Sequence, residues 1–160
     1  MAKHLKASIG KRAFSGAIAG VIGGLTHAAM NEVDRKILNY NADDLVLLGG
    51  VFTSDTALAR KIGIGMHLNF AAIFGATYAV LLQPKTDREA FRQGVTFAMT
   101  EHFGLFPLGI LVDQFHPHIQ RGTSERFFTP TSFVEASLRH LALGAGLGAS
   151  YPHILRKVSR

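Results

Sequence analysis

The chain has 160 residues, of which 48% are hydrophobic and 18% are charged, and it contains no cysteine. The length fits one domain, and the lack of cysteine excludes disulfides, thiolate metal sites, iron–sulfur clusters and cysteine nucleophiles. The charged fraction is below the roughly 25% of soluble domains, and the apolar residues form blocks separated by charged segments. The net charge of +6 comes mainly from the two ends and one short connection, without the basic runs interleaved with aromatic residues that indicate nucleic-acid binding. We therefore expect an integral membrane protein that does not bind nucleic acid.

The first apolar block predicts a helix over residues 13–31. A basic stretch before an apolar block is also the pattern of a signal peptide. The nearest approach to a cleavage site, Thr26-His27-Ala28, matches a small-x-small sequence poorly. We therefore expect an uncleaved membrane helix.

The connection that follows, residues 31–53, contains an apolar run over 45–52. Its length is unusual between two helices. We expect this segment to lie along the outer membrane surface or to dip partway into the bilayer. The second block then predicts a helix over 56–82, with Ser54 or Asp55 as its N-cap.

The third block predicts a helix over residues 87–112. Thr86 and Glu89 have capping-box spacing at its start. Pro107 is expected to kink this helix near its end, because proline cannot donate the helical hydrogen bond. A second long connection, 113–129, leads to the last block.

The fourth block predicts a helix over residues 133–155, entered through a second capping box formed by Ser132 and Glu135. Each of the four blocks has about 20 residues, which is the length a helix needs to cross a bilayer core of roughly 30 Å. The predicted fold is therefore all-α, a membrane four-helix bundle in a single transmembrane domain over residues 1–160.

The distribution of charge predicts the orientation of this bundle. Lysine and arginine outnumber the acids in both tails and in the connection before the third helix, whereas the other two connections have slightly more acids than bases. Basic residues stay on the cytoplasmic side of a membrane. We therefore expect both ends of the chain in the cytoplasm and the two long connections outside.

Small residues recur every fourth position on three of the predicted helices. Such ridges let helix backbones approach closely in lipid, where burial of apolar surface no longer drives association. The ridges are Gly16, Gly20 and Gly24, then Ala71, Gly75 and Ala79, and finally Gly144 and Gly148.

Each predicted helix contains one histidine, and the orientation above places all four in the outer half of the bilayer. Polar residues inside a membrane usually face the bundle interior and mark a site or a pathway. The four candidates for cofactor binding are His27, His67, His102 and His140, and a polar cluster at similar depth consists of Glu101, Glu135, Arg139, Asn69 and Asn31. We expect Glu101 to face away from the site if His102 faces it, since neighbouring helical residues point in different directions.

Three interpretations of the helix histidines stay open: hydrogen bonding between helices, ligation of haem b or a metal, and a proton relay. The Glu-x-x-His motif of di-metal bundles is absent. Haem needs only two opposed histidines, and His67 and His140 are the best matched in depth. The metal, if any, is unknown from sequence. His116 and His118, in the last connection, are expected to be solvated, and Glu135 is explained as a capping residue.

Two stretches resemble the YagU-like group of small bacterial inner-membrane proteins. They are Gly65-Met66-His67-Leu68 through Gly75-Ala76-Thr77-Tyr78, and His140-Leu141-Ala142-Leu143-Gly144 through Gly146-Leu147-Gly148. The chain differs in having Leu143 where a tyrosine often precedes the glycine, and in its long acidic first connection. The resemblance implies four membrane helices in a bacterial inner membrane and directs attention to His67 and His140, but implies no chemistry.

The sequence favours a non-enzymatic membrane protein that acts as an accessory subunit or binds a small ligand. No phosphate-binding glycine loop, nucleophile elbow or His-Glu-x-x-His sequence occurs. A haem- or pigment-binding electron carrier and a proton, ion or metal transporter are the alternatives. The expected partners are the lipid bilayer and either other membrane subunits or further copies of the chain.

Overall fold

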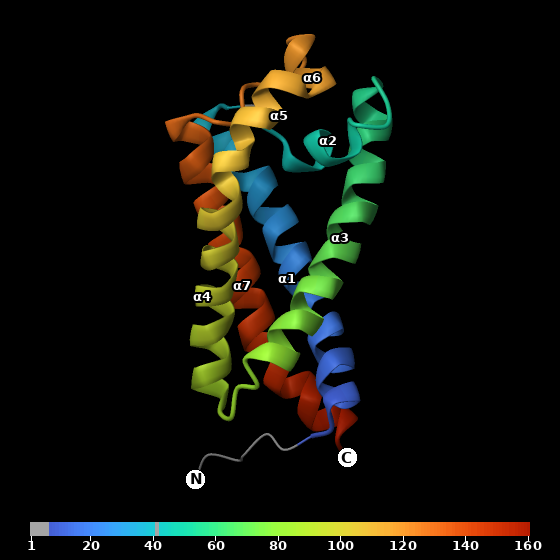
Figure 1. Ribbon diagram of the computed structural model, residues 1–160, viewed down its shortest axis with the longest axis vertical. Helices are drawn as coiled ribbons and strands as arrows, with labels where there is room; N and C mark the ends of the chain where they lie inside the picture. Colours follow the sequence, from blue (N-terminus) through green and yellow to red (C-terminus); the bar gives the residue numbers. More distant parts are fainter. Residues whose placement is uncertain (1–6, 41) are drawn as a thin grey trace.

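The computed structural model describes residues 7–40 and 42–160, and all regular secondary structure in them is helical (Figure 1). Four long helices run along one axis, and four short ones lie in the connections. The long helices are α1 (Ile9–Leu38), α3 (Thr56–Leu81), α4 (Asp87–Leu105) and α7 (Pro130–Val158). The short ones are α2 (Asp44–Gly49), the 3-10 turn η1 (Phe106–Leu108), α5 (Gly109–Phe115) and α6 (Pro117–Gln120).

Among the described residues, three helical stretches are long and apolar enough to cross a membrane. They are α1, α3 and the stretch from Asp87 to Phe115 that joins α4 to α5. This confirms an all-α protein with membrane-spanning character. The fourth long helix, α7, has 29 residues but does not reach the same apolarity.

The first predicted helix is too short at both ends, because α1 continues to Leu38 instead of ending at residue 31. Asn31 and Asp34 looked like the start of a connection, but both are buried against other helices. A polar side chain that finds its partners inside the bundle does not end a helix. Asn39, with a φ of 50°, ends it instead.

The last helix also begins earlier than the predicted residue 133. Its N-cap is Thr129, whose hydroxyl accepts a hydrogen bond from the backbone N–H of Ser132, 3.1 Å away. Pro130 follows at the first helical position, where its missing N–H costs nothing. The capping box predicted for Ser132 and Glu135 is therefore wrong, and Glu135 has a different environment.

The predicted caps at Asp55 and Thr86 and the kink at Pro107 are confirmed, whereas the capping box of Thr86 and Glu89 is only half formed. Asp55 caps α3 and Thr86 caps α4, each accepting a hydrogen bond from an N–H three residues further on. The carboxylate of Glu89 accepts from the N–H of Lys85 at 2.8 Å and so does not close the capping box. At Pro107 the 3-10 turn interrupts the third long helix, which is the predicted kink.

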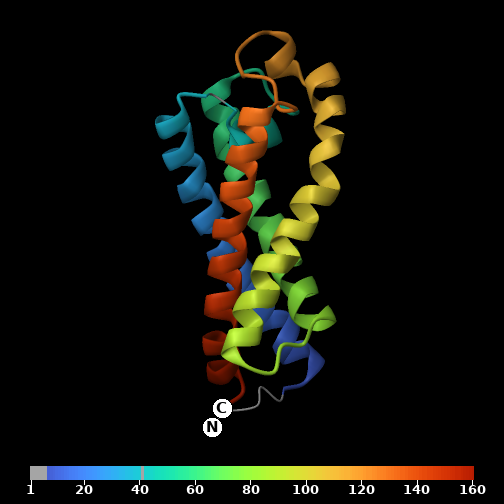
Figure 2. The same cartoon turned by 90° about the vertical axis from the view of Figure 1, so that its left-hand side faces the viewer.

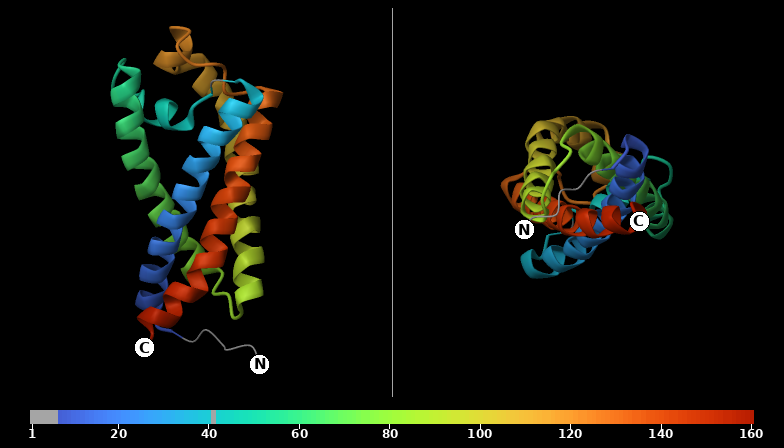
Figure 3. Two further views of the ribbon diagram at one scale, coloured as in Figure 1. Left: turned by 180° about the vertical axis from the view of Figure 1, so that it is seen from behind. Right: turned by 90° about the horizontal axis from the view of Figure 1, so that it is seen from below.

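The arrangement of the helices leaves one side of the bundle open. α1 packs between α3 and α7, and α4 packs on α7 (Figures 1 and 2). The chain's C-terminus and the start of α1 lie at one end, called here the terminal end; the opposite one is the loop end. α3 and α4 are joined at the terminal end and diverge toward the loop end, where α2 crosses the space between them (Figure 3).

The predicted small-residue ridges form the helix crossings. A Cβ atom on Gly75 of α3 would lie 2.2 Å from the carbonyl oxygen of Gly16 on α1, and one on Gly20 would lie 2.0 Å from that of Ala71. On the other side, a Cβ on Gly144 of α7 would meet the carbonyl oxygen of Gly94 at 2.7 Å. Backbones this close leave no room for any larger residue.

A tightly packed core fills the bundle toward its terminal end. Tyr78 is fully buried, and its hydroxyl donates a hydrogen bond to the carbonyl of Ala90 at 2.7 Å. Phe74 and Phe97 stack at 4.5 Å between ring centroids beside it. The buried members of this core are Ala19, Tyr78, Ala79, Ala90, Leu147, Tyr151 and Leu155.

The first long connection folds inward as helix α2. Asp43 caps this helix, and its apolar residues Leu45, Val46 and Leu47 are buried. A Cβ on Gly63 of α3 would lie 1.8 Å from the carbonyl oxygen of Leu45, so α2 rests directly on the α3 backbone. The first part of the apolar run, Leu45–Leu47, thus packs into the bundle and covers its open side, whereas Val51 and Phe52 are exposed.

Candidate functional site: a histidine-lined cavity at the loop end

The structure brings the four predicted histidines together in one row across the bundle. The ring centroids are 4.6 Å apart between His67 and His27, 5.3 Å between His27 and His140, and 4.9 Å between His140 and His102. The row therefore runs from α3 through α1 and α7 to α4, with one ring from each long helix.

The hydrogen bonds define the tautomers of the two outer rings. Nε2 of His67 lies 3.0 Å from the carbonyl oxygen of Gly24, which only accepts, so Nε2 is the donor. Nε2 of His102 lies 3.0 Å from the hydroxyl of Ser137, whose own proton is donated to the carbonyl of Phe133 at 2.7 Å. In both rings Nδ1 is left as an acceptor.

The two inner rings each face a carboxylate. Nδ1 of His140 lies 2.7 Å from the Ala136 carbonyl oxygen, and Nε2 lies 2.8 Å from Glu101. Because both ring nitrogens meet acceptors, His140 and Glu101 share a proton between them. Nε2 of His27 lies 3.8 Å from Asp44, while its Nδ1 is buried without a hydrogen-bond partner among the described residues.

Beside the histidines, Arg139 is completely buried among acids. Its Nε and Nη2 donate to the two oxygens of Asp34 at 2.7 and 2.8 Å, a paired geometry specific to arginine. Nη1 lies 2.8 Å from Asp44 and donates to the Ala42 carbonyl at 2.9 Å. Glu135 lies 3.3 Å from Nη2, and its oxygens accept no hydrogen bond from the described residues.

A second set of polar contacts fixes the N-terminus of α2. The side chain of Asn31 donates to Asp43 at 3.1 Å and accepts from the N–H of Asp44 at 3.3 Å. Asp43 also pairs with Arg35 at 2.5 Å and Arg60 at 3.1 Å. These contacts hold Asp44 at the edge of the histidine row.

The charge state of Asp44 is set by burial and by the basic groups around it. Burial is the largest effect and disfavours the charged form, but Arg139 together with His27 and His140 outweighs it and holds the pKa of Asp44 below its ordinary value. Asp44 is therefore ionised at neutral pH.

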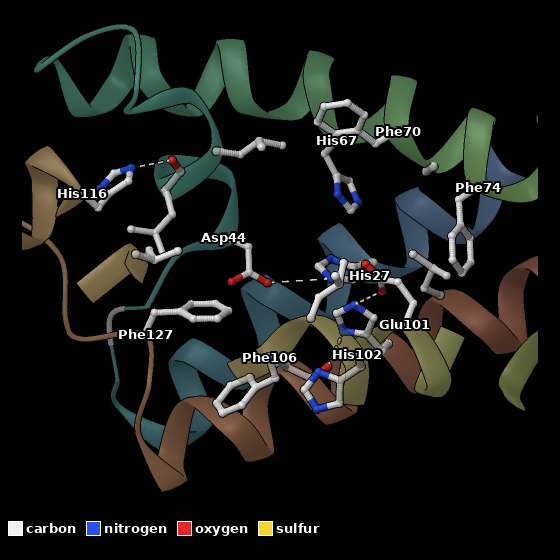
Figure 4. A pocket seen from close by; sticks show the side chains of 18 of the residues that line it. His27, Asp44, His67, Phe70, Phe74, Glu101, His102, Phe106, His116 and Phe127 are labelled. Atoms are coloured by element: carbon white, nitrogen blue, oxygen red, sulfur yellow. Dashed lines mark hydrogen bonds and ion pairs between the residues drawn. The ribbon is translucent and has the colours of Figure 1, made fainter. Parts of the chain in front are cut away.

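These groups border a cavity of about 500 Å³ between α3 and α4, beneath α2 (Figure 4). Figure 4 shows Asp44 at its centre, with His67 across from it. Most of the wall is apolar. The lining residues are the four histidines of the row, Asp44, Leu47, Leu48, Val51, Phe70, Ala71, Phe74, Glu101, Leu105, Phe106, Val112, His116, Phe127, Ala136 and Leu143.

The last connection closes the cavity at the loop end. The sequence predicted that its two histidines are solvated, and this prediction is wrong. His116 is 8% exposed, and its Nε2 donates to the carbonyl of Leu47 on α2 at 2.7 Å. His118 is fully buried, and its Nε2 lies 3.0 Å from the carbonyl oxygen of Thr53. Burial lowers the pKa of His116, so its neutral ring ties the two connections together.

Two further expectations need correction. Glu101 was expected to face away from the site, but Glu101 and His102 both line the cavity. The side chain of His140 on α7 contacts both of them. Asn69 does not join the polar cluster: its side chain is exposed and donates to the Gly65 carbonyl of its own helix at 2.8 Å. The other predicted members, Asn31, Glu135 and Arg139, are buried beside the row.

Sequence reasoning missed Asp34, Asp43 and Asp44 as members of the site. All three lay in a segment assigned to the outer connection. Asp34 lies three residues after Asn31, one helical turn further on the same face, and this spacing was the available signal.

The donor set does not fit haem between His67 and His140. The His27 ring lies between these two, and both Nε2 atoms are already engaged, with Gly24 and Glu101. Axial ligation needs two free nitrogens opposed across the macrocycle. Within the described residues, no group of three histidine, aspartate or glutamate side chains is arranged to hold a metal ion.

Comparison of the chain with protein-family models, curated proteins and solved structures finds no match.

Proposed function

We propose that this chain is a multi-pass membrane protein that binds a small, mainly apolar ligand in the histidine-lined cavity. The supporting observation is the cavity itself: about 500 Å³ of open space, with a mostly apolar wall and a few converging polar groups, within an otherwise close-packed bundle. Ligand sites in proteins have this size and composition.

In this proposal α7 also crosses the membrane, which makes four spans with both ends in the cytoplasm. The basic tails support this orientation. The charged side chains that lower the apolarity of α7, Glu135 and Arg139, are fully buried in the bundle and do not face lipid. The resemblance to YagU-like proteins supports a bacterial inner membrane as the location.

The topology is open to a direct test because the chain has no native cysteine. Glu125→Cys lies at the loop end and Ser159→Cys at the terminal end, and both positions are exposed. In intact cells a membrane-impermeant maleimide is expected to label Glu125→Cys alone, and Ser159→Cys only after the cells are opened. Labelling of both variants in intact cells contradicts the proposed topology.

Binding is better supported than transport. The core around Tyr78 and Tyr151 fills the bundle toward the terminal end, and both side chains are completely buried. The polar groups of the site lie on the other side of this core, beneath α2. A site that opens sideways between α3 and α4 and is blocked toward the terminal end suits a binding protein.

Binding in the cavity can be measured with a single tryptophan, since the chain contains none. Phe70→Trp places the reporter in the cavity wall, and Phe115→Trp places it at an exposed position outside. Titration of the detergent-solubilised protein with 4-phenylbutanol is expected to shift the emission of Phe70→Trp saturably and to leave Phe115→Trp with a linear, nonspecific response. The same response from both reporters contradicts binding in the cavity.

A second candidate, an accessory role in a larger assembly, is favoured by the exposed face of α4. Arg92, Thr96 and Thr100 are exposed on this helix and border a groove of about 680 Å³ toward the terminal end. Polar side chains on a membrane-spanning helix usually face protein. Another membrane subunit or a second copy of the chain would cover them.

A further inference from the structure

The polar atoms that face the cavity are almost all hydrogen-bond acceptors. The N–H groups of His67 and His102 are used on Gly24 and Ser137, and both ring nitrogens of His140 are engaged, with Ala136 and Glu101. Nε2 of His27 faces Asp44 from 3.8 Å, beyond hydrogen-bond distance, and the nearby carboxylate favours the ring proton on that nitrogen. What is left is Nδ1 of His27, His67 and His102. Of these, Nδ1 of His27 belongs to a side chain that is only 4% exposed and has no partner among the described residues. A buried acceptor without a donor is costly unless a ligand supplies one.

The charge beside the cavity is negative. One guanidinium, that of Arg139, is surrounded by Asp34, Asp44 and Glu135. The other carboxylate in the wall, Glu101, is offset by the proton that it shares with His140. Asp44 faces the cavity from α2 (Figure 4). One of its oxygens pairs with Arg139 at 2.8 Å, and the other faces Nε2 of His27 from 3.8 Å, too far for a hydrogen bond.

Aromatic faces complete the wall. Phe70 and Phe74 of α3 line one side, and Phe106 and Phe127 line the other (Figure 4). Phenyl rings attract a cation through their electron-rich faces, most strongly where water is excluded. Phe70 on α3 is 55% exposed and Leu105 on α4 is 52% exposed. The cavity therefore opens between α3 and α4, on the side that the bilayer would cover.

We propose that the ligand is a protonated lipophilic amine, whose ammonium group binds Asp44 and donates to the histidine acceptors while its apolar part lies among the phenylalanines. This inference rests on the proposed function and adds the chemical class of the ligand. A primary ammonium has three donors and no acceptor, which complements a wall with acceptors and excess negative charge. A quinone has only acceptors and fits this wall poorly. A hydroquinone supplies donors without the charge.

The test compares four ligands of one shape on the Phe70→Trp reporter: 4-phenylbutylamine, 4-phenylbutanol, N-acetyl-4-phenylbutylamine and trimethyl(4-phenylbutyl)ammonium. The amine is expected to bind at least about tenfold more tightly than the alcohol, because a hydrogen bond to a charged group is stronger than one between neutral groups. The acetylated amine, which has lost the charge, is expected to bind more weakly than the amine. The trimethylammonium ligand, which has lost the N–H donors, is also expected to bind more weakly.

Variants of the protein test the role of Asp44 as the carboxylate that binds the ammonium group. Asp44→Asn is expected to abolish the preference for the amine over the alcohol, whereas Asp44→Glu keeps it. Glu32→Gln removes a carboxylate that is paired with Arg60 outside the cavity, and should leave the preference unchanged. Thermal unfolding of each variant identifies any that fail to fold. The comparison of the four ligands uses Phe70→Trp without a change at Asp44, so it tests the proposal even if these variants do not fold.

The outcomes separate the two proposals. Equal affinities for amine, alcohol and acetylated amine overturn the amine proposal and leave a binding cavity. Tighter binding of the alcohol than of the amine also overturns it, in favour of a neutral donor. A linear response to every ligand removes the proposed function as well.

Discussion

Replacement of Arg139 by methionine is expected to lower the free energy of unfolding by about 3–5 kcal/mol, the usual loss when one partner of a buried ion pair is removed. Methionine fills a similar volume, so the loss comes mainly from charge. Asp34 and Glu135 are buried and would have no cation in contact. Unfolding of the purified protein in detergent, followed by circular dichroism, measures the change.

Arg156→Met is the matched control. Arg156 is on the same helix and pairs with Asp87 at 2.6 Å, but both side chains are partly exposed. Its loss should cost at most about 1 kcal/mol. Adding Asp34→Asn to Arg139→Met should recover part of the stability, because it removes one of the buried charges. Equal losses for the two arginine variants would show that the buried cluster does not stabilise the fold.

Gly75→Ala is expected to destabilise the bundle by at least about 2 kcal/mol, as overpacking of a rigid contact does. The new Cβ would lie 2.2 Å from the carbonyl oxygen of Gly16, and backbone atoms on both sides cannot move aside independently. α1 and α3 would have to separate along their whole crossing. The midpoint of thermal unfolding in detergent reports this change.

The same substitution at Gly65 provides the comparison. Gly65 lies on the same helix, and a Cβ there meets nothing within 4 Å. Alanine is a better helix former than glycine by up to about 1 kcal/mol, so Gly65→Ala should be neutral or slightly stabilising. A similar loss at both positions would mean that the close crossing at Gly75 is unimportant.

Much of the fold was predictable because it depends on neighbouring residues. Apolar blocks, caps such as Asp55 and Thr86, and the break at Pro107 all act over a few positions, and the structure has them where expected. The small-residue ridges also indicated which faces meet. What the sequence did not show is which ridge meets which, since that depends on pairing between distant segments.

The candidate site was predictable in its histidines and not in its acids. Each histidine lies in a clear apolar block, so its depth followed from the count of residues. Asp44 lies in a segment that looked external, and the packing of Gly49 and Gly63 together with the contacts of Asp43 brings it inside. Similarly, Glu135 matched a capping box by spacing, but the contact with Arg139 determines its position.

The polar character of α7 has a consequence for how the protein enters a membrane. An arginine at the centre of a helix costs about 2.5–3.5 kcal/mol on the scale of insertion by the translocon. Arg139, in the first half of α7, would meet part of this cost if α7 inserted alone, because its main partner, Asp34, is on α1. If α7 crosses the membrane as proposed, it is synthesised after α1 and needs α1 already in the bilayer. A truncated chain that lacks α1 should therefore leave α7 outside the membrane.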